Sequence, residues 1–195
     1  MLEHSQVPLH HQSKVFNRKL STELYAQLMF GKMINRRQCL EGKLISNPQF
    51  EELANNFDQY RALYELIGYE LVMRDGFAFI RTAEVSEIEK DDIARSFQGL
   101  LLVLFRGVME LGYTMDILLK DEAGLSDMRI EEIGKGQDKV EVLIACGMKS
   151  GNLVEHVKKL EARSVAYRNT KGCLVLTEAG TGFFQDLLGE GDLVI

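Results

Sequence analysis

The side chains that could do acid–base or metal chemistry in this chain are few and scattered. His156 is the only histidine inside a periodic segment, and it stands beside Glu155, where neighbouring helical side chains point in different directions. His10 and His11 fall in the first dozen residues, with no cysteine or carboxylate partner at ligand spacing. We therefore expect no catalytic residue, no metal site and no cofactor site, and we expect His156 to be a surface or half-buried helix residue.

Two glycine-rich stretches could suggest a phosphate-binding loop. IGKGQDK, residues 133–139, lacks the spacing of a Walker loop, and EAGTGFF, residues 178–184, matches no dinucleotide-binding fingerprint. In the second stretch, Gly180 and Gly182 follow LTE, where a strand is expected to return to a helix. A turn is the better explanation of these glycines, and no nucleotide-hydrolysing machinery is expected.

The net charge is −6, and the positive charge is concentrated in two segments. Residues 13–37 carry a net charge of +5 and residues 148–172 a net charge of +4, so the other 145 residues carry −15. In the second segment the charge lies on an expected helix and hairpin, the elements that a winged helix presents to DNA. The candidate DNA-contact residues are Lys149, Lys158, Lys159, Arg163, Arg168 and Lys171.

Contact with DNA through these residues is expected to use phosphates. No pattern of Arg and Asn demands base reading, so the contact should lack sequence preference and weaken steeply with salt. The alternative, in which Lys158 and Lys159 merely solvate a helix face, stays open.

The first half carries a different surface, rich in acidic and aromatic side chains. Exposed aromatic residues there would mark a protein interface. The candidates are Tyr60, Tyr64, Tyr69, Phe77 and Phe79, although such residues also serve as core.

Periodicity predicts a helix, a longer helix and then a hairpin in the first half. Ser21 is expected to cap a helix that runs to Gly31, and residues 33–45 can form either a short helix or a strand. Asn47-Pro48 starts a second helix, whose apolar stripe runs from Phe50 to Ile67 without a break. Asp75-Gly76 then supplies the positive backbone angles of a tight hairpin turn in residues 69–82.

The second half repeats this order. Residues 93–112 form an expected helix that is apolar on most faces, and residues 126–133 a short one. Residues 139–148 can be helix or strand, because period alone does not separate the two in a short apolar run. A helix at 151–162, a hairpin turning through residues 169–172 and a final amphipathic helix complete the unit.

The fold class is therefore mainly α with small β-hairpins, an α+β protein built from two tandem winged-helix domains. We expect a flexible lead at 1–18, a first domain at 19–83 for protein contact and a second at 84–195 for DNA contact. The start of the chain lacks a secretory signal, and GLLLVLF, residues 99–105, is too short to span a membrane. Cys39, Cys146 and Cys173 form no metal or disulfide pattern, so a cytoplasmic protein with reduced thiols is expected.

FDQYRALYELIGYELVMRDGFAFIR, residues 57–81, resembles the first winged helix of the MukE/MksE subunits of bacterial condensins, and the later elements follow in the same order. Without a long acidic tail, the chain looks more like the MksE branch. The resemblance implies a non-enzymatic subunit that dimerises, mainly through the first unit, and binds the kleisin (MukF/MksF-like), which bridges the heads of an SMC-like ATPase. It also implies DNA contact by Lys158, Lys159, Arg163, Arg168 and Lys171, in chromosome organisation and segregation at the nucleoid or in defence against plasmids.

Two other functions are less consistent with the sequence. A stand-alone winged-helix transcription regulator would need a base-reading helix, for which residues 151–162 offer only Asn152, His156 and two lysines. An enzyme is disfavoured because no pair of nucleophile and base is evident.

Overall fold

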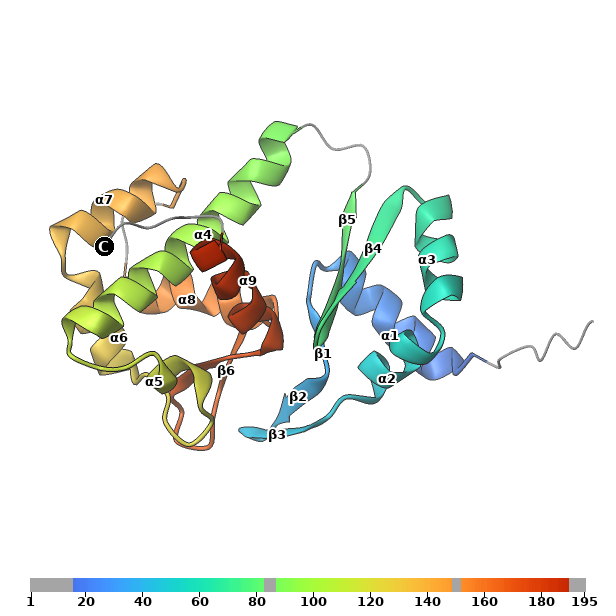
Figure 1. Cartoon of the computed structure of the whole chain (residues 1–195), viewed down its shortest axis with the longest axis horizontal. Coiled ribbons are helices and arrows are strands. Elements are labelled where there is room, and N and C mark those ends of the chain that lie inside the picture. Colours follow the sequence, from blue (N-terminus) through green and yellow to red (C-terminus); the bar gives the residue numbers. More distant parts are fainter. Residues whose placement is uncertain (1–15, 83–86, 149–151, 190–195) are drawn as a thin grey trace, which may run out of the picture.

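The computed structural model describes residues 16–82, 87–148 and 152–189, apart from the side chains of residues 87–95. The chain forms two units that lie side by side (Figure 1), and each has its own buried hydrophobic cluster. The α+β class is confirmed, since helices surround small antiparallel sheets. The tandem winged-helix arrangement stays a prediction.

The first unit packs three helices against a three-stranded antiparallel sheet of order β1-β5-β4. A second hairpin, β2–β3, projects from it (Figure 1). The elements are α1 (Arg18–Met29), β1 (Ile34–Asn35), β2 (Arg37–Leu40), β3 (Lys43–Ser46), α2 (Pro48–Asn55), α3 (Phe57–Leu66), β4 (Tyr69–Arg74) and β5 (Phe77–Thr82).

The start of α1 differs from the expectation at Ser21. Asn17 caps the helix, because its side-chain oxygen accepts a hydrogen bond from the Leu20 N–H at 3.2 Å. Ser21 instead lies inside the first turn, where its hydroxyl donates to the Asn17 carbonyl and hydrogen-bonds to the Tyr60 hydroxyl at 2.6 Å. The capping residue was thus predicted four positions too late.

The single helix expected over residues 47–67 is two helices. Asn47 caps α2 and Pro48 is its first residue, as predicted. At Asn56 the backbone leaves helical geometry, with φ −123° and ψ 28°, and the Asn56 side chain donates to the Glu52 carbonyl. Asparagine competes for backbone hydrogen bonds in this way, so it ends α2 although the apolar stripe continues into α3.

The turn residues of the first unit determine where its two hairpins form. β4 and β5 pair about Asp75-Gly76, as predicted, with Arg74 opposite Phe77. Gly76 has φ +88° and Gly68, after α3, has φ +82°, but Asp75 does not take the positive φ that was expected of it. The undecided stretch after α1 is strand, since Glu41 and Gly42 both have positive φ and close the β2–β3 hairpin.

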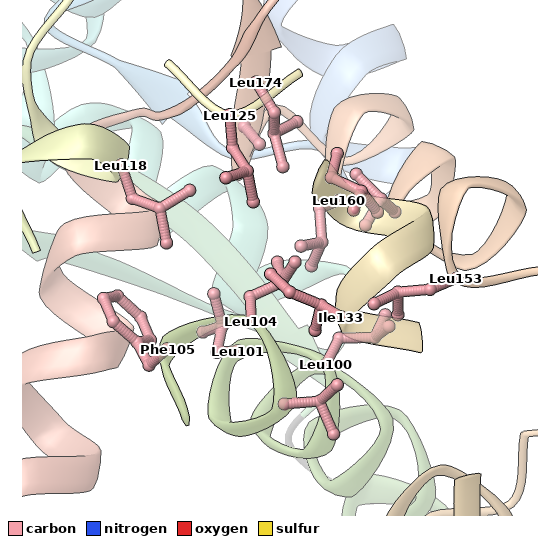
Figure 2. Packing of buried hydrophobic residues seen from close by; sticks show 14 of the residues in the cluster. Leu100, Leu101, Leu104, Phe105, Leu118, Leu125, Ile133, Leu153, Leu160 and Leu174 are labelled. Carbon is pink, nitrogen blue, oxygen red and sulfur yellow. The ribbon is translucent and has the colours of Figure 1, made fainter. Parts of the chain in front are cut away.

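The second unit wraps short helices and one hairpin around the long helix α4. Its elements are α4 (Glu87–Glu110), α5 (Asp116–Leu119), α6 (Asp127–Gly134), α7 (Gln137–Ala145), α8 (Leu153–Ala162), β6 (Ala166–Arg168), β7 (Leu174–Leu176) and α9 (Glu178–Gly189). The undecided segment at 139–148 is thus mainly helix. Figure 2 shows Leu101 and Leu104 of α4 gathered with Ile133 and Leu160, which confirms a buried central helix.

Gly180 and Gly182 lie inside α9 and do not form the expected turn. A Cβ on Gly180 would lie 2.2 Å from the Val165 carbonyl oxygen, and one on Gly182 would lie 2.7 Å from the Phe77 ring. These glycines therefore let α9 pack closely on β6 and on the first unit. Among the described helices, none is long and apolar enough to cross a membrane.

Candidate nucleic-acid and protein-contact surfaces

Helix α8 carries the two lysines at the centre of the candidate DNA surface. Asn152 caps the helix, and Leu153, Val157 and Leu160 bury one face of it in the core. Lys158 and Lys159 point away from that face and are exposed. Glu155 lies 2.6 Å from the Lys158 ammonium, and this hydrogen bond raises the pKa of Lys158. Both lysines are therefore accessible on the surface of α8.

The basic residues after α8 hold the hairpin in place. Arg168 forms ion pairs with Glu161 at 2.8 Å and Asp127 at 2.7 Å. The Lys171 ammonium donates to the Glu122 carbonyl at 2.6 Å, and Arg163 donates to the carbonyl of Phe30 in the first unit. Lys149 lies outside the described residues. The charge of Arg168 is therefore neutralised by two carboxylates of the same chain. Of the candidate DNA-contact residues that the structure describes, Lys158, Lys159 and Lys171 are exposed.

Three of the five aromatic residues assigned to a protein interface belong to the core. Tyr60, Tyr64 and Phe77 are at most 3% exposed, and burial raises the pKa of Tyr64 to about 12. Tyr69 is half-buried against the same core. The assignment of Tyr60, Tyr64 and Phe77 to a contact surface is corrected. The two tyrosines belong to the stripe of α3 that packs in the core of the first unit, and Phe77 of β5 is buried against Phe183 and Gly182 of α9.

Phe79 packs against the second unit, and its assignment to a protein interface stays a prediction. It is half-buried, and its ring lies 6.1 Å from Phe77 and 6.0 Å from Phe183 of α9, measured between centroids. The aromatic contact that β5 makes is therefore with the second unit of the same chain.

Part of the exposed apolar surface of the first unit lies at the C-terminal end of α3. Leu66 is 85% exposed, and Leu63 and Ile67 are exposed beside it. Tyr25 of α1 is also exposed and lies close enough to Tyr64 to contribute to its raised pKa. We call Tyr25, Leu63, Leu66 and Ile67 the α3 surface. Leu63 and Leu66 do not belong to the buried Phe57-Tyr60-Tyr64 stripe of the helix. Their apolar side chains outside that stripe were the feature of the sequence that could have indicated this surface.

A polar junction joins the two units. Buried Asn35 of β1 donates from its side chain to the Ser164 carbonyl at 2.7 Å, and its side-chain oxygen accepts from the Ala179 N–H at 2.9 Å. The Met33 N–H donates to the Arg163 carbonyl, and Arg37 pairs with Glu178 at 2.6 Å. No sequence pattern indicated that Asn35 would do this.

A cavity of about 290 Å³ lies at this junction. Side chains of both units line it, and most of them are neutral and polar. They include Gln27, Asn35, Gln38, Asn47 and Gln49 from the first unit and Ser164, Ala166 and Tyr167 from the second. Cys39 stands at its margin, with its thiol 3.5 Å from the Arg168 carbonyl oxygen.

His156 is buried, with 9% of its surface exposed, so the expectation of a surface or half-buried position is wrong. It lies on the core-facing side of α8 with Leu153 and Val157. Within the described part of the chain, no three His, Cys, Asp or Glu side chains gather as metal ligands would.

Comparison with known families gives one clear result. Condensin complex protein MksE matches residues 19–188, which include almost every described element of both units. No curated protein matches the chain. Because the match covers most of the sequence, the chain belongs to the MksE family of condensin complex proteins.

Proposed function

We propose that this protein is a homodimeric, non-catalytic accessory subunit of a bacterial SMC-like condensin. It binds the kleisin subunit, reaches the SMC-like ATPase through that kleisin, and contacts DNA without sequence preference. Each unit acts as a winged helix, and the complex works in the cytoplasm at the nucleoid, in chromosome organisation and segregation or in plasmid defence. Family membership supports the place in a condensin complex, and the surfaces support the division of tasks.

The observation that carries the proposal is the α3 surface. Leu63 and Leu66 are exposed one turn apart on α3, and Leu66 is almost fully exposed. Groups of exposed apolar side chains on a folded domain mark protein contact sites. We assign this surface to the homodimer. It replaces the buried aromatic residues as the contact site of the first unit.

The second unit supports weak DNA contact. Lys158 and Lys159 lie side by side in sequence on an exposed helix face, but Glu155 and Glu161 lie on the same helix. Such a surface suits contact with phosphates at low salt and provides no base-reading set. DNA binding by the isolated chain is therefore expected to be weak and to become stronger within the assembled complex.

Co-expression with the kleisin of the same complex tests the proposal. We expect the two proteins to purify together through affinity and size-exclusion steps at moderate salt. If the kleisin elutes alone while both proteins are folded, the proposal is wrong. An operator-like duplex bound far more tightly than random duplex would instead support a transcription regulator.

A further inference from the structure

Strand β6 has one edge that no strand covers within the described residues. The Val165 carbonyl accepts from Thr177 N–H, and the Asn169 N–H donates to the Cys173 carbonyl, both at 3.0 Å. Main-chain groups alternate along a strand, so those of Ala166 and Arg168 point away from β7. The pairing of Leu174 with Leu125 on the far side of β7 follows the same alternation.

Ala166 is the notable position on this edge. It is only 3% exposed, it lines the junction cavity, and its N–H and C=O make no hydrogen bond within the described part of the chain. Buried main-chain groups are almost always paired, with protein or with ordered water. An unpaired donor and acceptor on the same residue, facing a cavity, are what an added strand would use.

The cavity wall has the chemistry of a peptide site. The Gln38 carboxamide can both donate and accept, as a peptide main chain requires. The Gln27 nitrogen donates to the Gln49 oxygen and the Gln49 nitrogen donates to Glu23, both at 2.8 Å, which leaves each of these two carboxamides one donor hydrogen and an acceptor lone pair for a ligand. The charged lining residues Arg37 and Glu161 are already paired with Glu178 and Arg168. A neutral main chain therefore fits this cavity better than a phosphate or another charged ligand.

The length of the segment is limited at both ends. At one end the Asn35 side chain already donates a hydrogen bond to the Ser164 carbonyl, and at the other the Cys39 thiol already contacts the Arg168 carbonyl oxygen. Neither carbonyl is therefore open to an added strand. Ala166 is the single edge position between them. A strand rises about 3.3 Å per residue, so roughly three residues of a partner can lie in the cavity.

We propose that the junction cavity binds a short extended segment of a partner polypeptide, which pairs with both main-chain groups of Ala166 as an added strand. This inference rests on the proposed function, under which the segment belongs to the kleisin. The two units then act together at one site, since the first supplies the carboxamides and the second supplies the strand edge.

Filling the cavity tests the inference. Gln38→Trp places a large side chain in the cavity from the β2–β3 hairpin, and Lys43→Trp places the same side chain on the same hairpin outside the cavity wall. Two lost hydrogen bonds correspond to about a tenfold loss of affinity. We expect Gln38→Trp to bind the kleisin at least that much more weakly in a titration, and Lys43→Trp to bind it normally.

A second variant acts on the main chain alone. Ala166→Pro removes an N–H that β7 does not use, so the β6–β7 ladder survives while the added strand loses its donor. Thermal melting of both variants shows whether they fold. If Ala166→Pro unfolds, the unchanged chain can be tested by labelling Cys39 with a maleimide and locating the label by peptide mass mapping. We expect Cys39 to be labelled more slowly when the kleisin is bound.

The outcomes separate the two proposals. Normal kleisin affinity in a folded Gln38→Trp variant, or equal labelling of Cys39 in the free and bound chain, would overturn the cavity site and leave the accessory-subunit function standing. An unchanged chain that binds no kleisin would overturn both.

Discussion

The side-chain nitrogen of Asn35 lies 2.7 Å from the carbonyl oxygen of Ser164, which joins a strand of the first unit to the turn after α8 in the second. Ser164 has a φ of +59°, an unusual value for a residue with a side chain. Its carbonyl also accepts from the Thr177 hydroxyl, and Asn35 accepts from the Ala179 N–H at the start of α9. One buried asparagine thus fixes two elements of the second unit against the first.

Asn35→Ala should weaken this junction. The change leaves the Ala179 N–H without its partner in a buried place, and a buried unsatisfied donor costs about 1–3 kcal/mol. We expect a lower free energy of unfolding in urea and a larger radius of gyration in small-angle scattering. Gln185→Ala, an exposed change on α9, is the control and should alter neither. An unchanged radius with unchanged stability would show that Asn35 does not hold the units together.

Reversing the charge of the two exposed lysines should reduce DNA binding. Lys158→Glu with Lys159→Glu removes two positive charges from α8, and each lost phosphate contact lowers the salt slope of log affinity by about 0.9. We expect binding to a random duplex to weaken at low salt and its salt slope to fall by about 2. The fold should persist, because both side chains are exposed.

The matched control for this pair is Lys43→Glu with Lys120→Glu. It makes the same change of net charge. Lys120 pairs with Asp116 as Lys158 pairs with Glu155, whereas Lys43, like Lys159, forms no ion pair within the described part of the chain. Equal loss of DNA binding in both double variants would mean that net charge, and not α8, determines the interaction.

A charge on the α3 surface should separate the dimer. Leu63→Asp and Leu66→Asp place carboxylates at exposed apolar positions that an interface would bury, while the core residues Tyr60 and Tyr64 stay unchanged. Light scattering should give about twice 22.1 kDa for the unchanged chain and 22.1 kDa for the variants. Leu188→Asp, at an exposed leucine of α9, should leave the mass unchanged. A dimer that survives both α3 variants would move the interface elsewhere.

Alkaline pH should destabilise the fold through its buried tyrosines. Burial raises the pKa of Tyr64 from 10 to about 12, and the pKa values of Tyr60 and Tyr167 are raised as well. A raised folded-state pKa gives stability that is complete below pH 10 and is lost as pH rises from 10 towards 12. Unfolding in urea should thus need less denaturant above pH 10. In a tyrosinate absorbance titration Tyr64→Phe should remove one late-titrating group, and an unchanged curve would contradict its burial.

Much of the fold could be predicted from local patterns. The hairpins at Asp75-Gly76 and at residues 169–172, and the apolar helix α4, follow from turn residues and periodicity, which act over a few positions. The break at Asn56 could not be read in this way, because the apolar stripe runs through it and a side-chain hydrogen bond decides the outcome. Gly180 looked like a turn residue because its close contact with Val165 depends on tertiary packing.

The candidate surfaces were harder to predict than the fold. Lys158 and Lys159 are exposed as a helical pattern implies, whereas Arg168 is held by Glu161 and by Asp127, which lies far away in sequence. The aromatic residues of α3 were assigned to a surface because composition does not say which stripe faces the core. Asn35 carries no motif at all, and its role depends on two units meeting in space.

Native mass spectrometry of the chain purified with its kleisin tests the central claim most directly. The account predicts a complex that contains two copies of the 22.1 kDa chain together with the kleisin, stable at moderate salt and without DNA. A spectrum with only the free chain and the free kleisin, both folded, would contradict it.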